Sequence, residues 1–127
     1  MKAIDHYIEY SGCDLTEKDA IEGGYHQLSG IELHERMVDK RIHGDYIMGY
    51  RFVTQVYANG EVEGVNDVGT YDQGTWMIDK ENHTLTLKWK NGWIDTVTRA
   101  YDINGNIEFF DVNSGSWRTN FKKTENL

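Results

Sequence analysis

Three Asn-Gly pairs constrain the fold of this chain more than any other feature of its sequence. They stand at positions 59–60, 91–92 and 104–105, each between runs rich in Val, Ile, Thr, Tyr, Phe or Trp. Asn-Gly favours the two-residue turn of a β-hairpin, because both turn positions require a positive φ. With these turns as boundaries, we expect eight strands, at 41–48, 50–57, 61–66, 73–79, 84–90, 93–101, 106–112 and 116–122.

Every connection between these strands is short. Parallel neighbours need crossovers of a dozen or more residues, so the pattern predicts a mainly β protein with an antiparallel meander. Eight meandering strands can close into an up-and-down barrel, which removes exposed sheet edges and leaves room for one small ligand. The chain of 127 residues contains no proline, so every strand amide is free to join a ladder.

Helical signals precede the barrel. Thr16 resembles an N-cap with acids in the first turn of a short helix, which the glycines at 23–24 would end. Ser29 and Glu32 have the spacing of a capping box, which predicts a second helix over 29–39. Its apolar stripe, able to cover a sheet or close a barrel end, comprises Ile31, Leu33, Met37 and Val38. We expect one domain over 1–127. It consists of an acidic leader with a short helix at 1–28, the helix at 29–39 and the barrel at 41–122. We expect disorder only at 122–127.

The charge of the chain disfavours several classes of partner. Thirteen basic residues against 21 acidic ones give a formal net charge of -8, the wrong sign for binding nucleic acid or anionic lipid. The start of the chain lacks the pattern of a secretory signal, and the lone Cys13 cannot form an intrachain disulfide, so we expect a cytoplasmic protein. We expect a monomer or a homodimer. Residues 1–35 hold eight acids against two lysines, either as a solvated face or as a docking arm for a basic partner.

A resemblance to a known family spans residues 28–121. It is carried by the helix start at 28–30, the hairpin at 52–64, the sequence Gly74-Thr75-Trp76, the strand at 85–89, Gly92, Tyr101 and Trp117. This order resembles small bacterial lipocalin-like proteins of the calycin type, in a family of unknown function. The resemblance implies a β-barrel with a closing helix and implies little about chemistry. Many members are exported and carry a cysteine beside the Leu-x-x-x-Trp strand, where this chain has Thr86 and Lys88.

Motifs for metals and cofactors are incomplete. His34-Glu35 begins the zinc-protease pattern, but Val38 stands where the second histidine is required. The glycines form no phosphate-binding loop ahead of a helix, and the Asp-x-Asn-x-Asn sequence at 102–106 lacks the later positions of a calcium loop. A lone His43 in the barrel wall could ligate haem iron, although isolated histidines are more often surface residues. We expect no metal and no cofactor.

The strand expected at 93–101 is the most informative for function. Period two places Trp93, Asp95, Val97, Arg99 and Tyr101 on one face, and their apolar area predicts that this face points into the barrel. Asp95 and Arg99 would then lie about 13 Å apart along the strand, each needing another partner. The alternatives are a cross-strand ion pair or a reversed register that leaves both charges in solvent.

The candidate ligand-binding residues are Trp76, Trp93, Asp95, Arg99, Tyr101 and Trp117. The tryptophans could equally be plain core that fills a small barrel. We expect non-enzymatic binding of a small apolar or amphipathic ligand in the barrel. The alternatives are an acid-base lyase or isomerase that pairs Asp95 with Tyr101 or Tyr46, and a protein-interaction module that uses the acidic N-terminal segment.

Overall fold

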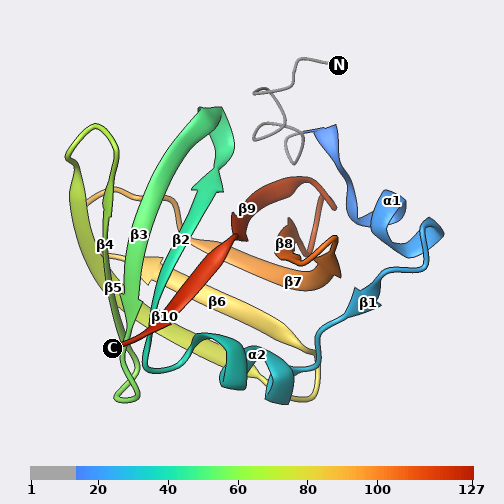
Figure 1. Ribbon diagram of the computed structural model, residues 1–127, viewed down its shortest axis with the longest axis horizontal. Coiled ribbons are helices and arrows are strands. Elements are labelled where there is room, and N and C mark those ends of the chain that lie inside the picture. The colour runs from blue at the N-terminus through green and yellow to red at the C-terminus, as the bar shows by residue number, and fades with distance from the viewer. Residues whose placement is uncertain (1–13) are drawn as a thin grey trace.

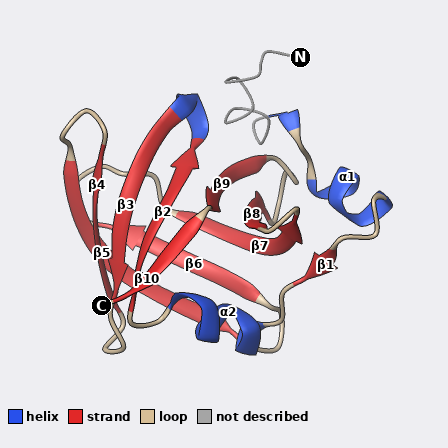
Figure 2. Cartoon of the chain, in the orientation of Figure 1, coloured by secondary structure: helices blue, strands red, loops and turns tan. Residues whose placement is uncertain are grey.

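The computed structural model describes residues 14–127. Figures 1 and 2 show a strongly curved sheet with short helices at its ends and edge. In chain order the elements are α1 (Glu17–Glu22), β1 (His26–Gln27), α2 (Gly30–Met37), β2 (Lys40–Tyr46), η2 (Ile47–Gly49), β3 (Tyr50–Val56), β4 (Glu61–Asn66), β5 (Tyr71–Asp79), β6 (Thr84–Trp89), β7 (Thr96–Ile103), β8 (Asn106–Asp111), β9 (Trp117–Phe121) and β10 (Lys123–Asn126).

Strands β2 to β9 form a closed barrel in meander order, and all their pairings are antiparallel. The ring closes where β9 meets β2, with Thr119 opposite Tyr46. The predicted eight-stranded antiparallel barrel with two short N-terminal helices is therefore confirmed. Seven of the predicted strands agree with the structure to within two residues at either end. The exception is the one expected at 93–101.

The strand β7 begins at Thr96, because residues 90–95 form a connecting loop rather than the start of the strand. Within β7 the buried Thr98 and Ala100 face the barrel interior, and Arg99 and Tyr101 face outward. The prediction that the face containing Arg99 and Tyr101 points into the barrel is wrong. The register is reversed, as in one of the two alternatives, and Asp95 is exposed. Arg99, however, is not left in solvent, because it forms an ion pair with Glu17.

The C-terminal residues continue the barrel wall. Strand β10 pairs with β2 from Lys123 opposite His43 to Asn126 opposite Lys40. The Lys122 amide also donates to the His43 carbonyl at 2.8 Å. The expected disorder over 122–127 is therefore wrong, because these residues satisfy the backbone groups of β2 beyond the end of β9.

The three Asn-Gly pairs make three different connections. Asn104 and Gly105 have φ values of 54° and 91°, as a two-residue turn with positive φ at both positions requires. At 59–60 only Gly60 has a positive φ, and the Tyr57 amide donates to the Glu61 carbonyl, as in a type I turn followed by a bulge. The pair at 91–92 lies in the longer loop 90–95, so its predicted two-residue turn is wrong.

Helix α2 covers one end of the barrel (Figure 1). The Ser29 hydroxyl accepts from the Glu32 amide, and the Glu32 carboxylate accepts from the Ser29 amide. These two hydrogen bonds confirm the capping box. Leu33 and Met37 are fully buried in the main core, whereas Ile31 is exposed. The apolar stripe is therefore narrower than predicted, and it acts as the floor of the barrel.

Helix α1 packs on the outside of the barrel. Its Thr16 capping box is present. A second apolar cluster forms between α1 and the outer face of β7, β8 and β9, from Ala20, Tyr101, Ile103, Phe110 and Trp117. The structure thus has two separate cores, one inside the barrel and one beneath α1.

Candidate functional site

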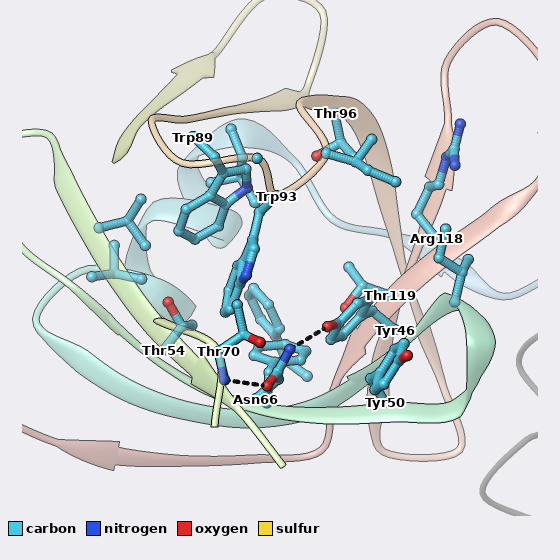
Figure 3. Close-up of a pocket in the computed structure, with 18 of the residues that line it drawn as sticks. Tyr46, Tyr50, Thr54, Asn66, Thr70, Trp89, Trp93, Thr96, Arg118 and Thr119 are labelled. Carbon is cyan, nitrogen blue, oxygen red and sulfur yellow. Dashed lines mark hydrogen bonds between the residues drawn. The ribbon is translucent and has the colours of Figure 1, made fainter. Parts of the chain in front are cut away.

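A cavity of about 330 Å³ lies inside the barrel (Figure 3). Met37 of α2 forms part of its floor. Its other end is bordered by η2, by the β4–β5 turn and by loop 90–95. Exposed Val68 and Ile94, which stand in this turn and this loop, form an apolar rim. The cavity is thus a cup that opens at the end opposite α2.

The wall of the cup is mainly apolar and aromatic. Its large side chains are Tyr46, Ile47, Tyr50, Phe52, Val56, Val62, Leu87, Trp89, Trp93 and Phe121. The inner positions of β3, β4 and β6 supply most of them, because alternate strand residues face the same side. Such a wall favours an apolar molecule, since burial of apolar surface is the main source of its binding free energy.

Trp93 is the central aromatic residue of the cup. Its ring lies 4.8 Å from the Trp89 ring and 6.2 Å from the Tyr46 ring, between centroids. Gly64 on β4 gives it room, because a Cβ at that position would come within 3.0 Å of Trp93 Cζ3. Trp93 therefore folds from its loop across the inner face of β4.

Loop 90–95 is fixed by a buried carboxylate on β5. Asp72 is fully buried and accepts from the backbone amides of Gln73, Asn91 and Trp93 at 2.7–3.1 Å. Burial alone would raise the pKa of Asp72, but these donors outweigh it, and the pKa is lowered. Asp95 closes the same loop by accepting from the Trp89 amide at 2.8 Å. The position of Trp93 is thus set by an acid from a distant part of the sequence.

Asn66 organises the polar side of the cup. Its Oδ1 accepts from the amides of Val68 and Thr70, and its Nδ2 donates to the Tyr46 hydroxyl at 3.0 Å (Figure 3). The β4–β5 turn and the Tyr46 ring are therefore held by one side chain. Thr119 also lines the cup, and its hydroxyl donates to the Asp45 carbonyl at 2.7 Å.

Arg118 enters the lining through a β-bulge in β9. Phe110 pairs with Trp117 and Phe109 with Thr119, so Arg118 is the extra residue between them. The bulge breaks the alternation, and both Arg118 and Thr119 line the cup while Trp117 faces outward. Bulges commonly re-aim a side chain in this way next to functional sites.

The six predicted ligand-binding residues are not brought together. Trp93 lines the cup, and Trp76 faces inward but is outside the lining, with its indole Nε1 donating to the Tyr57 carbonyl at 2.7 Å. Asp95 is an exposed loop residue. The other three lie on the outer face beneath α1, namely Arg99, Tyr101 and Trp117.

Arg99 and Tyr101 hold α1 on the barrel. The Arg99 guanidinium donates to both carboxylate oxygens of Glu17, at 2.6 and 2.9 Å, and the Tyr101 hydroxyl donates to the same carboxylate at 2.9 Å. The Arg99 hydrogen bond lowers the pKa of Glu17. Burial, followed by the bond to Glu17, raises the pKa of Tyr101 to about 12. These contacts join α1 to the outer face of the barrel, away from the lining of the cup.

Trp117 belongs to a second buried polar group on the outer face. Its Nε1 donates to Glu108 Oε1 at 2.7 Å. Burial raises the pKa of Glu108, although hydrogen bonds from Trp117 and Asn120 oppose the shift. The prediction that Trp117 lines or plugs the barrel is wrong, because the bulge at Arg118 reverses its direction.

Acid-base and metal chemistry find little support in the described part of the chain. No carboxylate, imidazole or thiol of residues 14–127 lines the cup. The pairing of Asp95 with Tyr101 is absent, since Asp95 is an exposed residue of loop 90–95 and Tyr101 is buried beneath α1. Tyr46 has no acid beside it in the lining. Residues 14–127 contain no cluster of three metal-ligating side chains. His43 binds Glu125 at 2.9 Å, and Cys13 lies outside the described residues.

Sequence reasoning missed Asn66, did not include Arg118 among the ligand-binding residues, and named Tyr46 only as a proton donor of the enzyme alternative. Asn66-Asp67 ahead of Gly69 is a turn signal that could have identified the Asn66 position. A bulge has no comparable sequence signal, so Arg118 could not be assigned to the interior.

In the described part of the chain, no helix is long and apolar enough to cross a membrane.

Comparisons with known proteins add no functional assignment. A scan against protein-family models found no match, and searches of curated proteins and of solved structures found none either. What the structure establishes of the expected resemblance is the closed eight-stranded antiparallel barrel.

Proposed function

We propose that this protein binds a small apolar or amphipathic molecule in the barrel cup, without catalysing its conversion. The observation that carries this proposal is an aromatic-lined cavity that is open at one end and floored by α2 at the other. Ligand pockets usually have volumes of about 300–1,000 Å³, so a cavity of about 330 Å³ is at the small end of that range. At roughly 30 Å³ for each water molecule in the liquid, it has the volume of about eleven waters, which suits one small molecule.

Binding without catalysis fits the lining better than acid-base chemistry does. A general acid and a general base must both reach the reacting group, and the described lining offers hydroxyls and one guanidinium but no carboxylate or imidazole. A pre-formed aromatic wall held by Asp72 and Asn66 instead reduces the ordering cost of binding.

We also propose that the chain is a lipocalin-like protein of the calycin type. The meander order and the helix at one barrel end support this relationship. Because one fold hosts many functions, the chemistry of a ligand follows from the cup and not from this relationship.

The test uses 2-naphthamide, a neutral aromatic probe of the right size, in titration calorimetry with the full chain. We expect saturable 1:1 binding that is lost in Thr70→Tyr, which places a ring at the cavity entrance. The matched control is Thr75→Tyr, because Thr75 is exposed on the outer face of β5 and lies outside the lining. If 2-naphthamide fails to bind, or binds equally to Thr70→Tyr, the proposed function is wrong.

A further inference from the structure

We infer that Tyr46 gives the cup a fixed hydrogen-bond donor, so that the cup selects an aromatic molecule with a neutral acceptor oxygen, as in a ketone or an amide. This inference rests on the proposed binding function and names the chemical class of its ligand. It is drawn from the direction of the hydrogen bond between Asn66 and Tyr46, two residues that line the cup.

The Asn66 side chain has one orientation that satisfies its surroundings. Its Oδ1 accepts from the backbone amides of Val68 and Thr70, at 3.2 and 2.8 Å. Backbone amides only donate, so a flipped side chain would place its own donor group against two other donors. The Nδ2 group therefore faces the Tyr46 hydroxyl, 3.0 Å away, and donates to it.

The Tyr46 hydroxyl is consequently the acceptor in this contact, and its own proton is left for another group. Within residues 14–127, Asn66 is the one hydrogen-bond partner of this hydroxyl. A ligand that fills the cup displaces the water that could accept the proton. Such a ligand loses affinity unless it supplies an acceptor of its own, because a buried donor without an acceptor is costly.

Tyr46 stands within the aromatic wall of the cup. Its ring centroid lies 5.4 Å from that of Tyr50, 6.0 Å from that of Phe52 and 6.2 Å from that of Trp93, and all three residues line the cup. Tyr46 is only half-buried, and Figure 3 shows the hydrogen bond of its hydroxyl near the Trp93 side chain. An aromatic ligand that packs against Trp93 is therefore also next to Tyr46.

Two threonine hydroxyls of the lining cannot replace Tyr46 as the donor. Thr54 Oγ1 donates to the Glu63 carbonyl at 2.7 Å. Thr119 Oγ1 donates to the Asp45 carbonyl at the same distance. Because their protons are engaged, these oxygens act only as acceptors toward a ligand. One hydroxyl donor suits a carbonyl oxygen, whereas a carboxylate loses far more hydration on entering a mainly apolar cup, which favours a neutral ligand.

Acetophenone and α-methylstyrene test the inference, because they have the same shape and differ in a carbonyl oxygen against a methylene group. NMR titration of the backbone amide and tryptophan indole signals of the full chain measures both dissociation constants. We expect acetophenone to bind about fivefold or more tightly than α-methylstyrene, which leaves the Tyr46 proton without an acceptor. In a cup without a donor the order would be the reverse, since a methylene group is desolvated more easily than a carbonyl. Tighter binding of α-methylstyrene would therefore overturn the inference.

Tyr46→Phe removes the donor and keeps the ring. We expect it to weaken acetophenone about fivefold and to leave α-methylstyrene within about twofold of the natural chain. Tyr50→Phe is the matched control, because Tyr50 also lines the cup and stacks on Tyr46, whereas the Asn66 amide bonds to Tyr46. It should leave the ratio of the two affinities unchanged. Equal changes of this ratio in the two variants would contradict a specific role of Tyr46.

Asn66→Asp tests the direction of the hydrogen bond while it keeps the Tyr46 hydroxyl. The new carboxylate can still accept from the Val68 and Thr70 amides, but toward Tyr46 it can only accept, so it takes the hydroxyl proton away from the ligand. We expect acetophenone to bind as weakly as it does to Tyr46→Phe. An affinity equal to that of the natural chain would refute the fixed donor. This variant also keeps the test decisive if Tyr46→Phe folds poorly, and circular dichroism checks the fold of each variant.

The outcomes separate this inference from the proposed function. If α-methylstyrene binds and the affinity for acetophenone does not depend on Tyr46, the inference is wrong while binding in the cup stands. If neither probe binds, the inference is wrong as well, and the titration with 2-naphthamide then decides the proposed function by itself.

Discussion

Replacing Arg99 with methionine separates a structural role of this residue from a ligand-binding one. The Glu17 side chain is 11% exposed and the Arg99 side chain 32%, so their ion pair is partly shielded from water. Removing one partner of a fully buried pair costs about 3–5 kcal/mol, whereas exposed pairs contribute about 0–1 kcal/mol. We expect Arg99→Met to lower the free energy of unfolding by about 2 kcal/mol, because it leaves the Glu17 carboxylate with only the Tyr101 hydroxyl.

The pH dependence of this loss identifies its cause. The pKa of Glu17 is lowered from its ordinary value of 4.5, first by the hydrogen bond from Arg99. A lowered pKa in the folded state contributes stability that is present above the unfolded value and is lost as the pH falls through the folded value. The difference between the natural chain and Arg99→Met should therefore be full at pH 7 and should shrink below about pH 4.5.

Urea unfolding monitored by tryptophan fluorescence, repeated from pH 7 down to pH 3, measures this difference. Glu17→Gln is the companion variant and should cost less than Arg99→Met, since it leaves a partly solvated guanidinium rather than a stranded carboxylate. Binding of 2-naphthamide should be unchanged in Arg99→Met. A loss of binding with unaltered stability would refute this reasoning and return Arg99 to the ligand site.

Two further predictions concern the architecture. Ser29→Ala should lower the free energy of unfolding in urea by about 1 kcal/mol, because the Glu32 amide loses its acceptor. Gly60→Val should lower it more, because Gly60 has a φ of 94°. The opposite order would contradict the described turn. Gly44→Ala should destabilise the barrel more than Ser29→Ala does, since its Cβ would lie 1.8 Å from the Asn120 carbonyl oxygen where β2 and β9 meet, and an unchanged urea midpoint would show that this seam opens easily.

Most of the barrel could be predicted because its signals are local. Alternating apolar residues and short connections define strands one at a time, and eight such strands leave few topologies. Strand β10 escaped prediction because its residues are polar and exposed on most positions. It is held by backbone pairing with β2, and a sequence gives no sign of which backbone groups need a partner.

The candidate site was harder to predict because two irregularities displace its residues. Period two was extended through 93–101 as though the strand were continuous, but Asp72 pulls residues 91–93 into a loop. That contact joins positions about twenty residues apart and has no local signature. The bulge at Arg118 likewise shifts the alternation of β9 by one residue, which sends Trp117 outward and Arg118 to the cup.

Charge is distributed unevenly between the lining of the cup and the rest of the chain. The chain has a net charge of -8, yet its described buried acids are used by the protein itself. Glu17 is paired with Arg99, Glu108 accepts from Trp117, and Asp72 binds the backbone of loop 90–95. Each of these carboxylates lies outside the lining of the cup. Arg118 is therefore the one charged residue in the described lining, and the rest of the wall is neutral.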